Sequence, residues 1–320
     1  MAIPSAIGRR SGWRIILLVL AAIWGASFLF IKVALADLSP AELTLGRCFL
    51  GAAALALTLL VTRLSVPREP RLWAHLFLVA LILNTVPFML FCYAELRVSS
   101  VVAGVANGTA PLFAAVFAFA ALRDERPTVH AVIGLVVGMA GVVVVLRVWD
   151  GFQADTIGVA AAITAAVCYG LGWVYLRYFV RDSGRSPLAL TFCQLACATL
   201  QLAVICLATS SRVPTLAPAT LVAILALGIL GTGFAYVLHL KIIRDAGATS
   251  ASTVAYLVPV FAVLIGVVVL HEPVGWNLGV GVLLVLFGAA LAQRRPKVLI
   301  ADRCALEGLQ RNAQTASVPS

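Results

Sequence analysis

The sequence predicts an all-α integral membrane protein in which ten transmembrane helices form two inverted repeats of five. The composition, the length of the apolar runs and a likeness between the two halves of the chain predict this fold. Of the 320 residues, 62% are hydrophobic and 11% are charged, whereas about 25% of the residues of a soluble domain are charged. The chain therefore lacks the polar surface that a soluble monomer needs, and we expect it to lie in a lipid bilayer.

The apolar runs have the length of membrane helices, which need roughly 20 residues each. The first run follows Arg9, Arg10 and Arg14 in the manner of a signal peptide. Its apolar stretch is too long for one, so we expect a retained helix. The expected spans are 15–36, 41–62, 72–94, 99–122, 129–147, 157–178, 188–209, 218–240, 249–270 and 275–293.

The basic residues set the orientation of these spans. With the N-terminus inside, all but five of the 23 lysines and arginines fall in cytoplasmic segments, as the positive-inside rule requires. We therefore expect a multi-pass protein of the inner membrane with both termini cytoplasmic. A net charge of +10 would suggest nucleic acid as the partner of a soluble protein. Here the basic residues lie between apolar runs, so no nucleic-acid partner is expected.

The two halves of the chain resemble each other. Pro40–Thr44 aligns with Pro187–Thr191, and Ala110–Ala114 aligns with Val258–Ala262. Five helices per repeat is an odd number, so the second repeat enters the membrane from the opposite side, which lets one central site face either side in turn. The expected organisation is a cytoplasmic segment (1–14), a first repeat (15–147), a linker (148–156), a second repeat (157–293) and a disordered cytoplasmic tail (294–320).

With these repeated features the chain resembles the EamA-type members of the drug/metabolite transporter (DMT) superfamily. The resemblance rests on Trp24–Phe28, on Pro40–Arg47, and on proline-centred fourth and ninth helices that each end in an acidic turn. It implies ten helices in two inverted halves around a central cavity, which moves small metabolites and most often exports them. The halves differ at one position, since Gln194 stands where the first repeat has Arg47.

We expect a secondary transporter that exports a small amphipathic metabolite, amino acid-like or drug-like, by alternating access. The alternatives are a membrane-embedded enzyme and a membrane protein that transports nothing. The sequence contains no P-loop, no G-x-S-x-G and no complete zinc motif, so we expect no enzyme activity, no catalytic residues, no metal and no cofactor. Glycines in the fifth and tenth helices favour close contact, either between these two helices or in a homodimer.

The substrate is expected near the middle of the membrane, between the repeats. Asn107 and Tyr256 are the first candidates, because each lies shortly before the central proline of its helix, Pro111 or Pro259. A proline frees a carbonyl four residues earlier, which is tolerated in a membrane where it faces protein or a wet cavity. Hydrogen bonding between helices is the alternative role. Further substrate-binding candidates at mid-span are Trp24, Ser27, Tyr169, Trp173 and Tyr236.

Arg47 is the one charged residue well inside an expected span. An intramembrane charge is a functional hypothesis by default, so Arg47 joins the substrate-binding candidates. The alternatives are a buried pair with Glu42 and an arginine that reaches the membrane surface. Glu125 and Glu272 end their helices at that surface, where we expect structural turns, and Pro111 and Pro259 are expected to be structural as well.

The acidic residues also bear on energy coupling. All 13 of them fall in loops, in the tails or within about a turn of a span end. Proton relays in transporters normally use acidic or histidine side chains inside the membrane. We therefore expect facilitative or exchange-type transport, or proton coupling through Glu125 or Glu272. The alternative is that water chains or the substrate's own ionisable group carry the proton.

Overall fold

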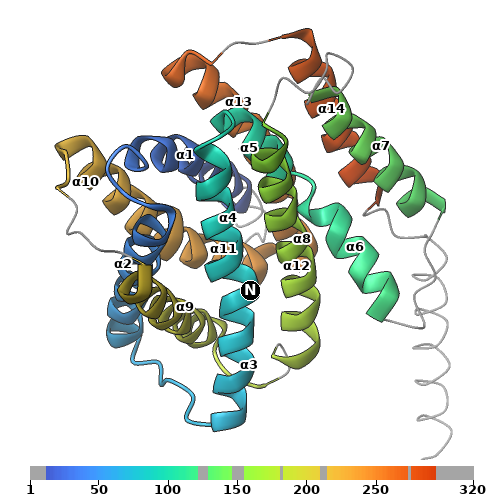
Figure 1. Cartoon of the computed structure of the whole chain (residues 1–320). Helices are drawn as coiled ribbons and strands as arrows, with labels where there is room; N and C mark the ends of the chain where they lie inside the picture. The colour runs from blue at the N-terminus through green and yellow to red at the C-terminus, as the bar shows by residue number, and fades with distance from the viewer. Residues whose placement is uncertain are drawn as a thin grey trace, which may run out of the picture.

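The computed structural model describes residues 12–121, 129–145, 155–180, 183–209, 215–272 and 275–292. Every regular element in these ranges is a helix (Figure 1). Glu125, most of the expected N-terminal segment and linker, and the expected tail lie outside the described residues.

The helices of the two halves follow the same order along the chain. The first half contains α1 (Gly12–Ala34), α2 (Pro40–Thr62), α3 (Pro70–Ala80), η1 (Leu81–Thr85), α4 (Val86–Glu95), α5 (Ser100–Asn107), α6 (Ala110–Ala121) and α7 (Val129–Val145). The second half contains α8 (Thr156–Phe179), α9 (Pro187–Thr209), α10 (Pro218–Leu225), η3 (Ala226–Phe234), α11 (Ala235–Ala246), α12 (Ala248–Ser252), α13 (Val254–Leu270) and α14 (Trp276–Ala292). The segments η1 and η3 are π-helices that continue the α-helices on either side.

The described chain is a multi-pass membrane protein. Eight of its helices are long and apolar enough to cross a bilayer, and two shorter apolar helices cover Val132–Val145 and Trp276–Gly288. These helices coincide with the expected spans to within a few residues, except that the helix expected to end at 240 continues to Ala246. Its last turns carry Lys241 and Asp245, which form an ion pair of 3.1 Å. Because these turns are polar, a prediction from hydropathy alone places the end of this helix too early.

Local sequence signals account for several helix ends. Ser39 caps α2: its Oγ accepts a hydrogen bond from the Glu42 N–H (3.3 Å), and the Glu42 carboxylate accepts one from the Ser39 N–H (2.9 Å). This reciprocal pair is a capping box. Asp155 begins α8 by accepting hydrogen bonds from the N–H groups of Ile157 and Gly158, and it also pairs with Arg97 at 2.8 Å. These bonds lower the pKa of Asp155.

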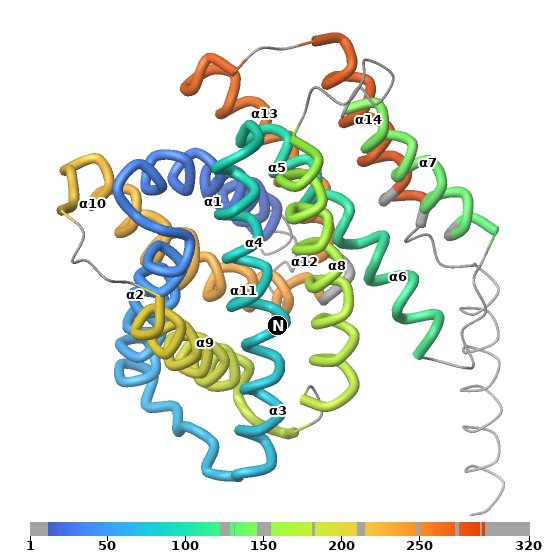
Figure 2. Tube along the Cα trace, viewed as in Figure 1, coloured from blue at the N-terminus to red at the C-terminus, as the bar shows by residue number. Residues whose placement is uncertain are grey.

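The contacts between helices repeat from one half to the other. Helix α1 packs on α13, and its counterpart α8 packs on α6; α2 packs on η3, and its counterpart α9 packs on α3. The counterparts α2 and α9 pack on each other, and so do α7 and α14, which lie side by side at the right of Figure 1 and Figure 2. The fold is therefore built from two similar units, and the first two helices of each unit pack on helices of the other unit.

Two glycines make the crossings between the units possible. A Cβ at Gly25 of α1 would lie 2.5 Å from the Cβ of Phe261, and a Cβ at Gly170 of α8 would lie 2.7 Å from the Cβ of Phe113. Gly170 follows Tyr169 as Gly25 follows Trp24, and Phe113 and Phe261 each stand two residues after the proline of their helix. The same close crossing therefore occurs twice, once in each half.

The glycines of α7 and α14 face each other within the chain. A Cβ at Gly141 would lie 2.7 Å from the Gly281 carbonyl oxygen, and a Cβ at Gly288 would lie 2.5 Å from the Gly134 carbonyl oxygen. Close packing of two helices at small residues is typical of membrane proteins. These glycines are thus already used inside one molecule, and a homodimer through the same helices stays a prediction.

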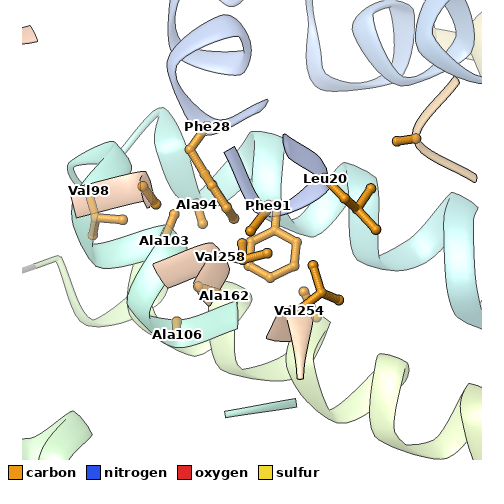
Figure 3. Packing of buried hydrophobic residues seen from close by; sticks show 14 of the residues in the cluster. Leu20, Phe28, Phe91, Ala94, Val98, Ala103, Ala106, Ala162, Val254 and Val258 are labelled. Carbon is orange, nitrogen blue, oxygen red and sulfur yellow. The ribbon is translucent and has the colours of Figure 1, made fainter. Parts of the chain in front are cut away.

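The largest buried apolar cluster joins both halves. Figure 3 shows Phe28 of α1, Phe91 of α4 and Val258 of α13 converging there. The rings of Phe28 and Phe91 meet edge to face, with their centres 5.8 Å apart. Small residues such as Ala103, Ala106 and Ala162 let α5 and α8 approach this cluster closely.

Candidate functional site

Among the residues that the structure describes, one cation is buried inside the bundle. The Arg47 side chain projects from α2 and is 8% exposed. Its Nε donates a hydrogen bond of 2.9 Å to Thr232 Oγ1, and its guanidinium carbon lies over the Phe88 ring. The predicted alternative partner, Glu42, accepts hydrogen bonds from Ser39 at the start of α2. Among the described residues, no carboxylate forms an ion pair with Arg47.

The two π-helices carry equivalent threonines, one of which contacts this cation. Thr85 is the last residue of η1, and Thr232, its counterpart in the repeat, lies in η3. Thr232 Oγ1 accepts from Arg47 and donates to the Leu227 carbonyl (2.9 Å), whereas Thr85 Oγ1 donates to Gln201 Oε1 (2.6 Å). Each π-helix therefore binds a side chain of the other half.

A separate set of neutral polar groups is linked by hydrogen bonds inside the bundle. Gln194, the counterpart of Arg47, donates from Nε2 to Asn84 Oδ1 (2.5 Å), and Asn84 Nδ2 donates to the Tyr236 hydroxyl (3.4 Å). Asn84 and Gln194 are buried. The Arg47 charge also acts electrostatically on Tyr169 and Tyr236. The centre thus combines one positive charge with amide and phenol groups.

Aromatic side chains surround the polar groups. The ring of Trp24 lies 6.4 Å from that of Tyr236 and 5.4 Å from that of His239, and its indole N–H donates to the Gly231 carbonyl (3.2 Å). Tyr169 stacks on Trp173 with ring centres 6.0 Å apart and meets Phe88 edge to face at 6.4 Å. Such rings suit the apolar part of a small ligand.

The structure therefore brings together most of the predicted site residues. Arg47, Trp24, Tyr169 and Tyr236 lie around one centre, with Trp173 at its edge, 43% exposed. Ser27 is buried one turn after Trp24, and its hydroxyl donates to the Ile23 carbonyl (3.1 Å).

Asn107 and Tyr256 lie elsewhere in the bundle. Asn107 is the half-buried last residue of α5, and α6 begins at Ala110, just before the buried Pro111. Pro259 is buried inside the continuous helix α13, near Gly108, so the two proline-containing helices cross there. Tyr256 packs with Leu135 against Leu112. The structure thus groups Tyr256 with α6 and α7 and not with the aromatic residues around Arg47.

The predicted structural residue Glu272 joins two helices of different halves. Its carboxylate accepts hydrogen bonds from the Ser100 N–H (2.8 Å), the Ser100 hydroxyl (2.9 Å) and the Val101 N–H (3.0 Å). These groups begin α5, and a carboxylate is favoured at a helix N-terminus. Glu272 therefore fastens the end of α13 to the start of α5.

Sequence reasoning missed Glu95, the last residue of α4. Its side chain is fully buried, and neither carboxylate oxygen has a hydrogen-bond partner. Its position at a span end gave no signal of burial. The contacts of Phe88 with Arg47 and of Gln201 with Thr85 were missed as well, because an apolar ring and a distant glutamine carry no signal until helices are placed side by side.

Comparisons with known proteins agree with this architecture. The chain is 26% identical over 279 residues to the uncharacterized transporter YoaV of Bacillus subtilis (strain 168), covering 83% of this chain and 91% of that protein. It is 26% identical to the uncharacterized transporter YvbV of the same organism, covering 93% and 96%, and 26% identical to an uncharacterized transporter of Archaeoglobus fulgidus, covering 84% and 93%.

A solved crystal structure shows the same fold with a TM-score of 0.64, at 24% identity, over 92% of this chain and 99% of that one. The sequence profile of the EamA-like transporter family matches residues 12–147 and 156–293, one match in each half. The chain therefore belongs to the EamA-like transporter family of the DMT superfamily and is a multi-pass membrane transporter.

Proposed function

We propose that this protein exports a small amphipathic metabolite that carries a carboxylate, such as an apolar amino acid, by alternating access. Ten crossings in two inverted halves, in the inner membrane with both termini cytoplasmic, form the frame. The substrate carboxylate binds Arg47, and its apolar part lies among Trp24, Tyr169 and Tyr236. We further propose that Asn107 of α5 and Tyr256 of α13, which lie apart from this centre, contact the substrate along its path through the bundle.

The observation that carries this proposal is the pairing of Arg47. A cation inside a membrane protein normally pairs with an acid or with backbone carbonyls, but among the described residues the partners of Arg47 are a hydroxyl and an aromatic ring. The planar guanidinium suits a carboxylate, which it binds through two parallel hydrogen bonds. An anionic group of the substrate supplies the charge that is missing from the described protein partners.

The repeated contacts support alternating access. Helices α1 and α8 cross α13 and α6 at equivalent glycines, so the same crossing is available on either side of the centre. In inverted repeats, movement of one half against the other exposes a fixed central site to each side of the membrane in turn.

The test is counterflow in proteoliposomes with radiolabelled L-phenylalanine and L-leucine. We expect exchange of both, and competition by the unlabelled amino acids. L-phenylalaninamide keeps the ring and the amine but lacks the carboxylate, so it should compete at least about 30-fold more weakly, which corresponds to about 2 kcal/mol.

Arginine variants link this preference to the site. Arg47→Gln should bind the amino acid and its amide equally weakly, and the matched control Arg177→Gln, at an exposed arginine of α8, should behave as wild type. If wild-type protein exchanges neither amino acid, or if Arg47→Gln keeps the preference for the carboxylate, the proposed substrate class is wrong.

A further inference from the structure

Glu95 is an acidic side chain without a partner at one end of the helix bundle. It is the last residue of α4, its side chain is fully buried, and neither carboxylate oxygen accepts or donates a hydrogen bond in the described structure. A buried ionised carboxylate without a partner is so unfavourable that the group takes up a proton instead. In this conformation the Glu95 carboxyl is therefore neutral.

The nearest cation is bound to the backbone and not to the Glu95 side chain. Lys32 Nζ donates to the carbonyl oxygens of Glu95 (2.6 Å) and Val98 (3.3 Å). The Glu95 carbonyl ends α4, where a positive charge is favoured, and the Val98 carbonyl lies in the turn that follows this helix. Lys32 thus holds α1 to the end of α4, while the Glu95 carboxyl accepts no hydrogen bond from it. The Lys32 charge still acts electrostatically on that carboxyl.

A second acid at the same end is already satisfied. Glu272 accepts three hydrogen bonds at the start of α5, which is the bonding of an ionised carboxylate. Its negative charge acts on Glu95 and opposes a second negative charge nearby. The other groups that act on Glu95 are Arg47 of α2, and Cys92, one turn earlier on α4.

Five helices, α1, α2, α4, α5 and α13, meet at this point. Gly266 brings α13 against α5, since a Cβ there would lie 2.6 Å from Val101 and 3.2 Å from the Glu272 carboxylate. Cys92 is buried beside Ile31 and Leu43, with its sulfur 3.7 Å from Thr44 Oγ1. The ends of α4 and α13 and the start of α5 lie together at the top of Figure 1. We call this region the Glu95 end of the bundle.

We propose that Glu95 is a proton-binding site that controls the Glu95 end: this end is closed while the carboxyl is protonated and opens when it ionises. This builds on the proposed function, because alternating access requires each end of the bundle to open. The step is a single proton transfer, in which the carboxyl O–H bond breaks, the proton passes to water entering at this end, and a carboxylate remains.

The contacts explain how ionisation would open this end. A charged Glu95 attracts the Lys32 ammonium away from the carbonyls that it joins and repels the carboxylate of Glu272. Both effects weaken the links that hold α1, α5 and α13 to the end of α4. The sequence pointed to Glu125 or Glu272 for protons, whereas Glu272 is the acid whose hydrogen bonds are already satisfied.

The first experiment needs no substrate. Purified protein in lipid is titrated with pH and followed by infrared spectroscopy, which detects the C=O stretch of a neutral carboxylic acid. We expect such a band in the wild type at neutral pH, lost as the pH rises, and absent from Glu95→Gln. The control Asp37→Asn should leave the band unchanged, because hydrogen bonds from Thr220 and Ala217 lower the pKa of Asp37 and keep it ionised.

The second experiment measures the opening. With Cys92 as the sole cysteine, its rate of alkylation by N-ethylmaleimide is followed over the same pH range, with and without Glu95→Gln. A negative charge on Glu95 disfavours the neighbouring Cys92 thiolate and would by itself lower the wild-type rate. A rise in the ratio of the wild-type rate to the Glu95→Gln rate therefore reports access. We expect the ratio to rise several-fold where the infrared band disappears, since the glutamine variant should stay closed.

Each result decides the proposal. Identical infrared spectra for the wild type and Glu95→Gln would overturn it, and so would a constant ratio of alkylation rates. Failure of amino acid counterflow with a positive result in both experiments would reject the proposed substrate and leave the proton site standing.

Discussion

The guanidinium carbon of Arg47 lies 4.0 Å from the centre of the Phe88 ring, so a cation from α2 is stacked on an aromatic residue of α4. A desolvated cation–π contact contributes up to about 2 kcal/mol. Phe88 therefore keeps Arg47 oriented while its outer N–H groups remain available to a ligand.

Phe88→Leu should weaken this orientation. We expect the affinity for L-phenylalanine to fall about fivefold to thirtyfold, or about 1–2 kcal/mol, measured by equilibrium binding to protein in detergent. The control Phe77→Leu removes an aromatic ring that is 45% exposed on the outside of α3 and should bind as wild type. Unchanged affinity in Phe88→Leu would show that the stacked ring does not support binding.

Gly25→Ala and Gly170→Ala should destabilise the two equivalent crossings. The new methyl groups would overlap Phe261 and Phe113 respectively, and overpacking of this kind costs about 1–3 kcal/mol. Thermal unfolding in detergent should therefore occur at lower temperature in both variants. Gly279→Ala is the control, because no atom lies within 4 Å of its added Cβ; equal melting of all three variants would contradict the close crossing.

Asp37 should make stability depend on pH. Its carboxylate accepts hydrogen bonds from Thr220 Oγ1 (2.6 Å) and the Ala217 N–H (2.8 Å), which lower its pKa in the folded protein. A group with a lowered folded pKa stabilises above its unfolded pKa and loses this effect as the pH falls through the folded pKa. The melting difference between wild type and Asp37→Asn should be full at neutral pH and shrink in acid. A constant difference would assign the effect to something other than ionisation.

Asn107→Ala and Tyr256→Phe should reduce L-phenylalanine counterflow without lowering the amount of protein in the membrane. Both side chains are half-buried and lie near the crossing of the proline-containing helices. Transport at wild-type rates in both variants would assign these residues to packing between helices.

The proposed orientation in the membrane can be tested by labelling introduced cysteines. In a background without native cysteines, Leu216→Cys should react with a membrane-impermeant maleimide added outside cells, and Val66→Cys should react only after the membrane is opened. Both positions are exposed and lie beside helix ends, at 43% and 37%. Fusions after residue 293 should be active as cytoplasmic reporters; a periplasmic signal there would reverse the topology.

Most of the fold could be predicted from the sequence, because a membrane helix needs a long apolar run and little else. The repeat, visible in pairs such as Pro40 and Pro187, further indicated which helices are counterparts. The π-helices could not be predicted, since Leu81–Thr85 is as apolar as an ordinary helix turn.

The site was predicted in part. Arg47, Trp24 and Tyr236 stand out because polar and aromatic groups are few at mid-span, but their partners Phe88, Gln194 and Thr232 come from other helices. Whether Glu95 faces protein or water depends on how Lys32 and Glu272 are placed around it, which no local pattern records. Burial of a residue at the end of a span is a property of the assembled bundle.

The two halves are similar in structure, but Gln194 stands in the second half where the first half has Arg47. Within the described residues, the centre of the bundle is therefore charged on one side only. Equal charges on both halves would let a bound anion settle in either of two orientations. In the proposed transport cycle, the charge on α2 gives the substrate carboxylate a single binding orientation and keeps it with the first half. Under this proposal the apolar part of the substrate changes its contacts as the halves move, so the aromatic rings that it contacts in each state select among related molecules.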